Sequence, residues 1–329
     1  MRVGRITLQK FFGEKTLGRN RNTRNGGNMK IQNIGIYRNL LIQLDKVVKH
    51  TRQGSYKTRE RYHSAWKRFC AFLADNYRLE KIANVAPKHI VAYTKYMQEK
   101  GLSASTIKTD LTAIRFYHDQ MAYTKHTLPD NNKLNLKKRK FGGVDRTWSH
   151  CEFNKMIALC WQTGNENYAC IAVLGYYTAL RIEECFKLDT AQAEKAIKTG
   201  ILTVKGKGGL VRDVPVQETI IIELKKMLAI TPQGHKLFVA PNDKTHLAIK
   251  RLQNFINYHR NKFADVGHGV PLTFHGLRHT AAANWYKSLK DKGFSDYAAR
   301  KQVAAWLGHG RDDVTRIYLA GIKDGDDDV

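Results

Sequence analysis

Hydrophobic residues recur at steps of three and four through the first part of the chain, with polar residues between them. This spacing puts the apolar side chains on one face of each helix, and it predicts an array of four helices over residues 34–122. The expected buried positions, helix by helix, are Leu40, Leu41, Leu44, Val47 and Val48; Tyr62, Trp66, Phe69, Phe72 and Leu73; Ile90, Tyr93, Tyr96 and Met97; and Ile107, Leu111, Ile114 and Tyr117.

Residues that begin and end helices separate these runs. Pro87 suits the first turn of the third helix, Gly101 ends that helix, and Ser103 or Ser105 can cap the fourth. We expect the outer face of the fourth helix to be polar, with Lys108, Thr109, Arg115 and His118.

The pattern breaks after residue 122. Residues 123–147 contain Pro129, Asn131 and Asn132, which interrupt regular structure, and then a basic run of Lys137, Lys138, Arg139 and Lys140. This segment is predicted to be a basic linker between two domains, and the basic run is either a DNA contact of that connector or a solvated charge run.

The remaining residues, 148–329, form a second domain that is again mainly helical. Ser149 with Glu152 three residues later marks a helix start. The stretch G-I-L-T-V-K-G-K-G-G-L-V-R-D-V-P-V alternates around a glycine-rich tip and predicts a β-hairpin. The fold class is therefore mainly α with a small β-hairpin, an α+β arrangement.

Two further helices are expected near the end of the chain. The first has an apolar stripe of Leu277, Ala281, Trp285 and Leu289, and His275 and Arg278 share a face away from that stripe. The second carries Val303, Trp306 and Leu307, and Gly308 should end it.

Charge narrows the class of partner. The chain has 56 Lys and Arg against 29 Asp and Glu, a net charge of +27 and a pI near 9.9, which favours a polyanion through steering and counterion release. Nucleic acid is the first candidate, although a ribosomal-type or membrane-surface protein would fit the charge alone. Residues 1–33 form a basic extension without apolar period, either an arm that reaches along DNA or a disordered leader.

Export and metal binding are not indicated. No apolar run of membrane-spanning length and no signal-peptide core occur, and the five cysteines contain no C-x-x-C pair. We expect a cytoplasmic protein with reduced, mostly buried cysteines, no zinc site and no membrane partner.

Six residues of the second domain carry the side chains that a DNA-cleaving tyrosine needs. Such a tyrosine requires positive charge on the non-bridging oxygens, a proton for the leaving oxygen and a base for its phenol. The six residues are Arg181 in T-A-L-R-I-E-E, Lys207 in V-K-G-K-G-G, His275 and Arg278 in H-G-L-R-H, His309 in L-G-H and Tyr318 in T-R-I-Y. Each of them alone has a plainer interpretation, as a surface ion pair, a turn lysine, a helix cap or a packing tyrosine.

These motifs resemble, in order and spacing, the catalytic domain of the tyrosine recombinases, which include phage integrases and Xer-type and Cre-type recombinases. T-A-L-R-I-E-E-C-F-K-L is similar to the family's first-arginine helix, usually written T-G-L-R-I-S-E-L-L-x-L, and H-G-L-R-H-T matches its H-x-L-R-H-T box. His309 precedes Tyr318 by nine residues, the usual interval, whereas the 31 residues between Arg278 and His309 exceed what compact Xer-type members have and indicate a small extension.

The resemblance implies a role for each residue and for each domain. Residues 34–122 would be a SAM-like core DNA-binding domain and residues 148–329 the catalytic domain. Tyr318 would form a 3′-phosphotyrosyl link, with no metal or other cofactor. Arg181 and Arg278 would bind the phosphate, Lys207 would protonate the leaving oxygen, His275 would manage the proton of the tyrosine, and His309 would donate to the phosphate.

One of these assignments has a local alternative, and another has an expected partner. Lys205 competes with Lys207, but it falls on the strand before the G-K-G turn that carries the family's lysine. Glu184, three residues after Arg181, is expected to hold that arginine in place.

A site-specific recombinase or integrase would act on double-stranded DNA recombination sites as a homo-tetramer, with accessory DNA-bending or directionality proteins as further partners. The alternatives are a type IB topoisomerase, which shares the chemistry, and a catalytically silent DNA-binding protein on the same scaffold.

Overall fold

The structure of the protein is a computed structural model that describes residues 31–51, 53–138, 143–267, 269–308 and 313–322. The described part is helical except for one two-stranded hairpin, which confirms the expected fold class. The chain divides at residues 139–140 into two compact units, and each is described by itself. Most of the basic extension and the last two residues of the basic run lie outside the described residues.

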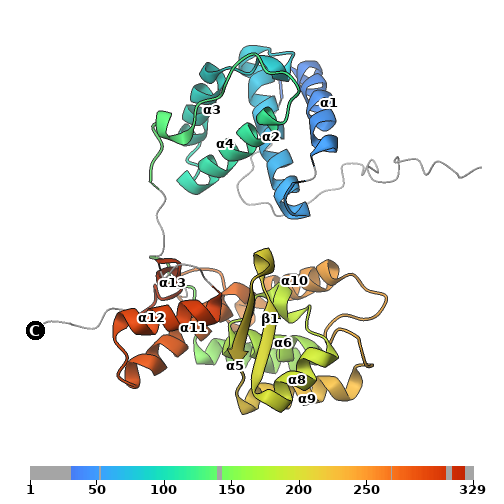
Figure 1. Ribbon diagram of the computed structural model, residues 1–329, viewed down its shortest axis with the longest axis vertical. Helices are drawn as coiled ribbons and strands as arrows, with labels where there is room; N and C mark the ends of the chain where they lie inside the picture. The colour runs from blue at the N-terminus through green and yellow to red at the C-terminus, as the bar shows by residue number, and fades with distance from the viewer. Residues whose placement is uncertain (1–30, 52, 139–142, 268, 309–312, 323–329) are drawn as a thin grey trace, which may run out of the picture. The chain divides into compact units, whose positions relative to one another are not determined.

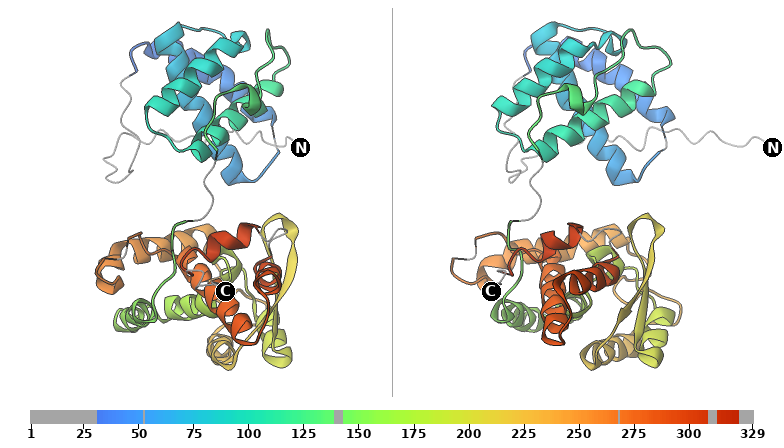
Figure 2. Two further views of the ribbon diagram at one scale, coloured as in Figure 1. Left: turned by 90° about the vertical axis from the view of Figure 1, so that its left-hand side faces the viewer. Right: turned by 60° about the vertical axis from the view of Figure 1, so that its left-hand side comes forward.

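The first unit consists of four helices around one core (Figure 2). Ser55 and Ser103 cap two of them by accepting from the backbone N–H groups of Thr58 and Thr106, and Pro87 occupies the first turn of another. Trp66 and the aromatic rings around it are fully buried. The elements are α1 Ile34–His50, α2 Tyr56–Tyr77, η2 Ile82–Asn84, α3 Pro87–Glu99, α4 Ala104–Asp119 and η3 Asn131–Lys133.

Two expectations for this unit need correction or extension. The expectation that His118 lies on a polar face is wrong, because it follows Ile114 by four residues and is buried with the apolar stripe, only 2% exposed. Part of the segment expected to be linker packs on the unit: Leu134 is buried, and Arg115 donates to the carbonyl of Pro129 and to Asn131.

The second unit places a hairpin beside a group of helices (Figure 1), with α8 next to β1 and α12 next to β2. Strands β1 and β2 are antiparallel, with Ile201 opposite Pro215 and Lys205 opposite Val211, as the alternating pattern predicts. Its helices and strands are α5 His150–Gln162, α6 Glu166–Thr178, α7 Ile182–Cys185, α8 Thr190–Thr199, β1 Ile201–Lys205, η4 Lys207–Gly209, β2 Val211–Pro215, α9 Glu218–Ile230, α10 Thr245–Phe263, α11 Phe274–Asp291, α12 Asp296–Leu307 and α13 Asp313–Tyr318.

Helix ends in this unit follow the sequence signals. Ser149 and Glu152 form the expected capping box at the start of α5, and Gly308 ends α12 in the left-handed conformation, with φ of 66°. The long interval before Gly308 is accounted for by the extension of α11 to Asp291 and by a turn that α12 follows.

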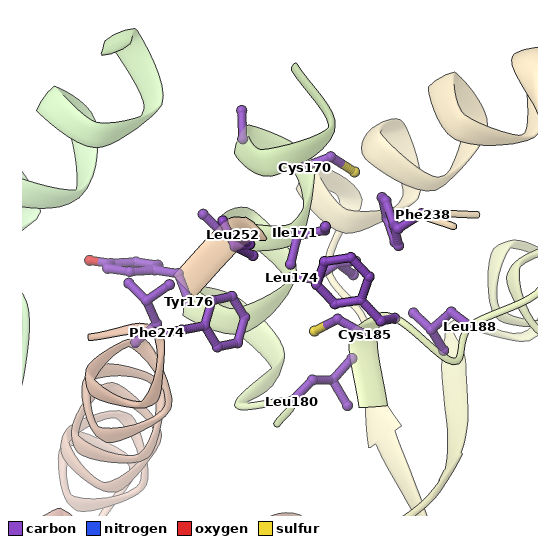
Figure 3. Close-up of a cluster of buried hydrophobic side chains, with 14 of the residues drawn as sticks. Cys170, Ile171, Leu174, Tyr176, Leu180, Cys185, Leu188, Phe238, Leu252 and Phe274 are labelled. Atoms are coloured by element: carbon purple, nitrogen blue, oxygen red, sulfur yellow. The ribbon is translucent and has the colours of Figure 1, made fainter. Parts of the chain in front are cut away.

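One hydrophobic core anchors the segments that carry candidate site residues (Figure 3). Leu180 and Cys185 flank the Arg181 segment, and Phe274 directly precedes His275; all three side chains are buried in this core. Burial by a shared core fixes these segments relative to each other.

Within the described ranges, no helix is both long and apolar enough to cross a membrane. Cys151 is exposed, and the other four cysteines are buried with free thiols, as expected.

Candidate active site

Arg181 lies at the junction between α6 and α7, where the backbone makes a sharp turn. Ala179 ends α6 in the left-handed region, with φ of 51°, at the position where the family motif usually has glycine. The side chain of Arg181 is 29% exposed, and its Nη1 donates to Oε1 of Glu184 at 2.9 Å. The expected contact between Arg181 and Glu184 is therefore confirmed.

Glu184 also binds a second arginine that the sequence analysis did not single out. Arg212 on β2 donates from Nη1 to Oε1 at 2.9 Å and from Nη2 to Oε2 at 2.7 Å, a two-pronged pair with both side chains buried. Burial of Glu184 acts to raise its pKa, but hydrogen bonds from Arg212 and Arg181 outweigh it and lower the pKa to about 2. We call Glu184, Arg181 and Arg212 the Glu184 cluster.

The hairpin tip lies next to the Glu184 cluster. A Cβ on Gly206 would lie 3.0 Å from Oε1 of Glu184 and 3.3 Å from Nη1 of Arg212, so only glycine fits without a shift. Lys207 begins the 3₁₀ turn at the tip, whereas Lys205 is exposed at the end of β1. The side chain of Lys207 lies outside the described part, so its catalytic role stays a prediction.

Arg278 is the most deeply buried of the candidate residues. Its side chain has no exposed area, Nη2 donates to the carbonyl of Leu307 at 2.5 Å, and Nη1 donates to the carbonyl of Ala179. The expectation that Arg278 lies on a polar face is therefore wrong, because α11 packs against α6, α12 and α13 on this side. The two backbone carbonyls accept hydrogen bonds from the guanidinium and so allow its burial. Burial, together with Arg181, lowers the pKa of Arg278 to about 10, against a raising contribution from Tyr318.

Tyr318 lies against three residues of α11. Its ring is stacked on that of His279 with 4.4 Å between centroids, and the centroid of His275 is 5.6 Å away. The guanidinium carbon of Arg278 lies 5.6 Å from the centroid of the Tyr318 ring. Tyr318 is 8% exposed. His279 therefore packs directly against the ring of Tyr318.

Both histidines are neutral near pH 7. Loss of hydration, followed by the charges of Arg278, Arg181 and Arg146, lowers the pKa of His275 to about 4, although the residue is exposed. Burial lowers the pKa of His279 to about 4 in the same way. A neutral imidazole can accept a proton from a phenol beside it.

The structure thus brings together four of the six predicted site residues: Arg181, His275, Arg278 and Tyr318. His309 lies outside the described residues. Arg212 was missed, although one signal was present: it occupies an inward position of a strand whose next inward residue is the fully buried Val214. As far as the chain is described, no group of three or more His, Cys, Asp or Glu is suited to a metal ion.

Comparison with known proteins identifies the class of this site. Residues 148–323 match the model of the phage integrase family, and residues 41–124 match that of the phage integrase N-terminal SAM-like domain. The chain belongs to the phage integrase family. This recombinase therefore joins a SAM-like core-binding domain to a tyrosine recombinase catalytic domain, and it is a site-specific, DNA-cleaving and DNA-rejoining enzyme.

Individual relatives agree with this family. The recombinase is 24% identical over 236 residues to tyrosine recombinase XerC of Psychromonas ingrahamii, covering 68% of this chain and 72% of XerC. A lambda integrase dimer bound to a COC′ core site has the same fold, with a TM-score of 0.63 at 18% identity over 88% of this chain and 97% of that one. The Tn1549 transposon integrase bound to transposon right-end DNA aligns with a TM-score of 0.55 at 16% identity, covering 85% and 94%.

Proposed function

We propose that this recombinase cuts DNA by attack of Tyr318 on the scissile phosphate. The bond from the phenolic oxygen to phosphorus forms as the bond from phosphorus to the 5′ oxygen breaks, which leaves a 3′-phosphotyrosyl link and a free 5′ hydroxyl. The observation that carries the proposal is the contact of Tyr318 with both His275 and Arg278 on a single helix. A nucleophile, a base and a cation are thereby within one cluster.

The proton of the phenol passes to His275 in this scheme. Its ring is neutral at neutral pH because the pKa is lowered to about 4, so it has a nitrogen that can accept a proton, and the two rings form an edge-type pair with an interplanar angle of 67°. A base with so low a pKa holds the proton weakly and returns it readily when the link is reversed.

In this scheme Arg181 and Arg278 neutralise the negative charge of the scissile phosphate. Arg181 keeps 29% of its side chain exposed beside Glu184, so part of its guanidinium is available to non-bridging oxygens. Arg278 is buried beneath Tyr318, so phosphate reaches it only after that ring moves aside.

Lys207 and His309 complete the scheme by analogy with the family. Lys207 would give a proton to the 5′ oxygen from the hairpin tip, and His309 would donate to the phosphate after Gly308. The 5′ hydroxyl of a partner strand then attacks the link, restoring a phosphodiester and freeing Tyr318. The energy of the broken bond is kept in the link, so the scheme uses no cofactor.

Strand exchange of this kind requires several protomers. Lambda integrase has been described as a tetramer bound to a Holliday junction. For this recombinase we propose a homo-tetramer on two synapsed double-stranded sites, assisted by accessory DNA-bending or directionality proteins. The net charge of +27 supports binding of the protomers to DNA.

A nicked suicide duplex tests the function. The duplex carries the junction sequence at the ends of the DNA segment that contains the gene, and the nick releases a short strand so that cleavage is trapped. The unaltered protein should give a covalent adduct, and Tyr318→Phe should bind the duplex with little change and give none. Absence of adduct from the unaltered protein would indicate a silent DNA-binding protein, and adduct with relaxation but no strand exchange would indicate a topoisomerase.

A further inference from the structure

Arg212 makes three hydrogen bonds in the interior of the catalytic domain. In addition to its two bonds to Glu184, its Nε donates to the carbonyl of Trp306 at 2.9 Å. Its side chain is 5% exposed. A planar guanidinium with three bonds in fixed directions holds its partners at defined angles, which a lysine cannot do.

Arg212 also lies beside the two backbone segments that lead to Lys207 and His309. A Cβ on Gly206, the residue before Lys207, would lie 3.3 Å from Nη1 of Arg212. A Cβ on Gly308, the residue before His309, would lie 3.0 Å from Cδ of Arg212. Two glycines therefore allow the hairpin tip and the end of α12 to approach the same side chain closely.

Arg212 also sets the charge around Arg181. Oε1 of Glu184 accepts from both arginines, and the Glu184 cluster holds two positive charges and one negative charge. Its net charge is +1. Without Arg212 the carboxylate and Arg181 would cancel, and the attraction for a phosphate would fall.

We propose that Arg212 is a positioning residue for DNA cleavage: it holds the hairpin that carries Lys207 and the end of α12, and it leaves Arg181 its full charge toward phosphate. The inference rests on the proposed function of Lys207 and Arg181. Arg212 itself touches neither DNA nor the reacting atoms in this scheme, because its side chain is buried and only 5% exposed.

A structural ion pair alone would give a different result from a positioning residue. Loss of a buried pair lowers the stability of the fold and affects all substrates equally. Loss of a residue that positions the general acid affects most the substrate that needs the acid. A duplex with a 5′-bridging sulfur makes this distinction, because a thiolate leaves without a proton donor.

The experiment compares Arg212→Met and Arg212→Lys with the unaltered full-length protein in single-turnover cleavage of the suicide duplex. Arg212→Met should cleave the ordinary phosphodiester about 100-fold more slowly, as for a catalytic group that is misplaced by about 1 Å. The loss on the sulfur-bridged duplex should be several-fold smaller, and the dissociation constant for the duplex should change little. The cleavage rate of Arg212→Lys should lie between the rates of Arg212→Met and of the unaltered protein, because lysine keeps the positive charge but lacks the planar guanidinium.

Arg251→Met is the matched control. Arg251 pairs with Asp243 on the surface of the same unit and is 54% exposed, so the same substitution there removes one charge without touching the Glu184 cluster. Its cleavage rate should equal that of the unaltered protein on both substrates.

Several outcomes would overturn the proposal. One is folded Arg212→Met that cleaves within threefold of the unaltered rate; another is an equal loss on both substrates. If Arg212→Met does not fold, an unaltered rate for Arg212→Lys on both duplexes is decisive against it. Absence of adduct from the unaltered protein would instead be a failure of the proposed function.

Discussion

The rings of Tyr318 and His279 are stacked, with 4.4 Å between their centroids and 28° between their planes. Helix α13, which carries Tyr318, has six residues and would not be stable by itself. The position of Tyr318, the proposed nucleophile, therefore depends on the helices that α13 packs against, which are α12 and α11, the helix that also supplies His275 and Arg278.

Replacing the stacking partner should loosen the nucleophile. We expect His279→Ala to lower the free energy of unfolding by about 1–3 kcal/mol, because a buried ring is lost from beneath Tyr318. Adduct formation should slow as well, since the phenol is less well oriented. Urea unfolding and the suicide duplex measure the two effects, with the exposed His246→Ala as control. If His279→Ala has the same stability and the same rate of adduct formation as the unaltered protein, the stacked ring of His279 does not hold Tyr318 in position.

Acid should destabilise the fold through the same histidine. The pKa of His279 is lowered to about 4 in the folded state, against an ordinary 6.5. As the pH falls below 6.5, the unfolded chain takes up a proton first, so stability is lost progressively between pH 6.5 and 4. The urea midpoint should fall from pH 7 to pH 5 by less in His279→Gln than in the unaltered protein. Identical falls would contradict the assignment.

The choice between the two hairpin lysines can be measured directly. Lys207→Ala should slow cleavage of an ordinary phosphodiester strongly and that of a 5′-bridging sulfur substrate little, because only the first needs a proton donor. Lys205→Ala is the matched control two residues away and should behave like the unaltered protein. If Lys205→Ala shows the sulfur rescue instead, Lys205 is the general acid.

The glycine between His275 and Leu277 is predicted to be intolerant of a methyl group. A Cβ on Gly276 would lie 2.5 Å from the carbonyl oxygen of Arg146 and 2.6 Å from Nε1 of Trp148, whose indole is held by its hydrogen bond to the carbonyl of Thr273. Gly276→Ala should therefore cost about 1–3 kcal/mol by overpacking and should slow adduct formation by displacing His275. Gly269→Ala, where nothing lies within 4 Å, is the control. A melting temperature that is equal for both variants would refute the prediction.

Sequence signals were informative where they are local. Apolar periodicity located α1 to α4, α11 and α12, and short motifs of fixed spacing pointed to Arg181, His275, Arg278 and Tyr318, which the structure brings together and whose catalytic roles stay predictions. The burial of Arg278 could not be predicted, since it depends on carbonyls of Ala179 and Leu307 that are distant in sequence. No periodicity reveals which carbonyls meet a guanidinium.

The sequence analysis also missed contacts between strands and helices that are far apart in the sequence. Arg212 interrupts an otherwise apolar inward face of β2, which indicates a buried charge but not its partner. Glu184, the partner of Arg212, had already been assigned to Arg181 in the same motif, so no second partner was sought for it. The domain boundaries at residues 33, 122 and 147 stay predictions, and the packing of Leu134 shows that linker composition does not prevent a segment from joining a core.

Ala179 adopts a backbone conformation that is unfavourable for its own residue type. Its methyl group makes the left-handed conformation costlier than it would be for glycine, by roughly 1–2 kcal/mol, while its carbonyl accepts from Arg278. In population terms, that cost corresponds to roughly five- to thirtyfold in the ratio of folded to unfolded chain, and the packing of the catalytic domain has to offset it. The carbonyl that meets Arg278 is thus held in place by its surroundings and against the local preference of residue 179.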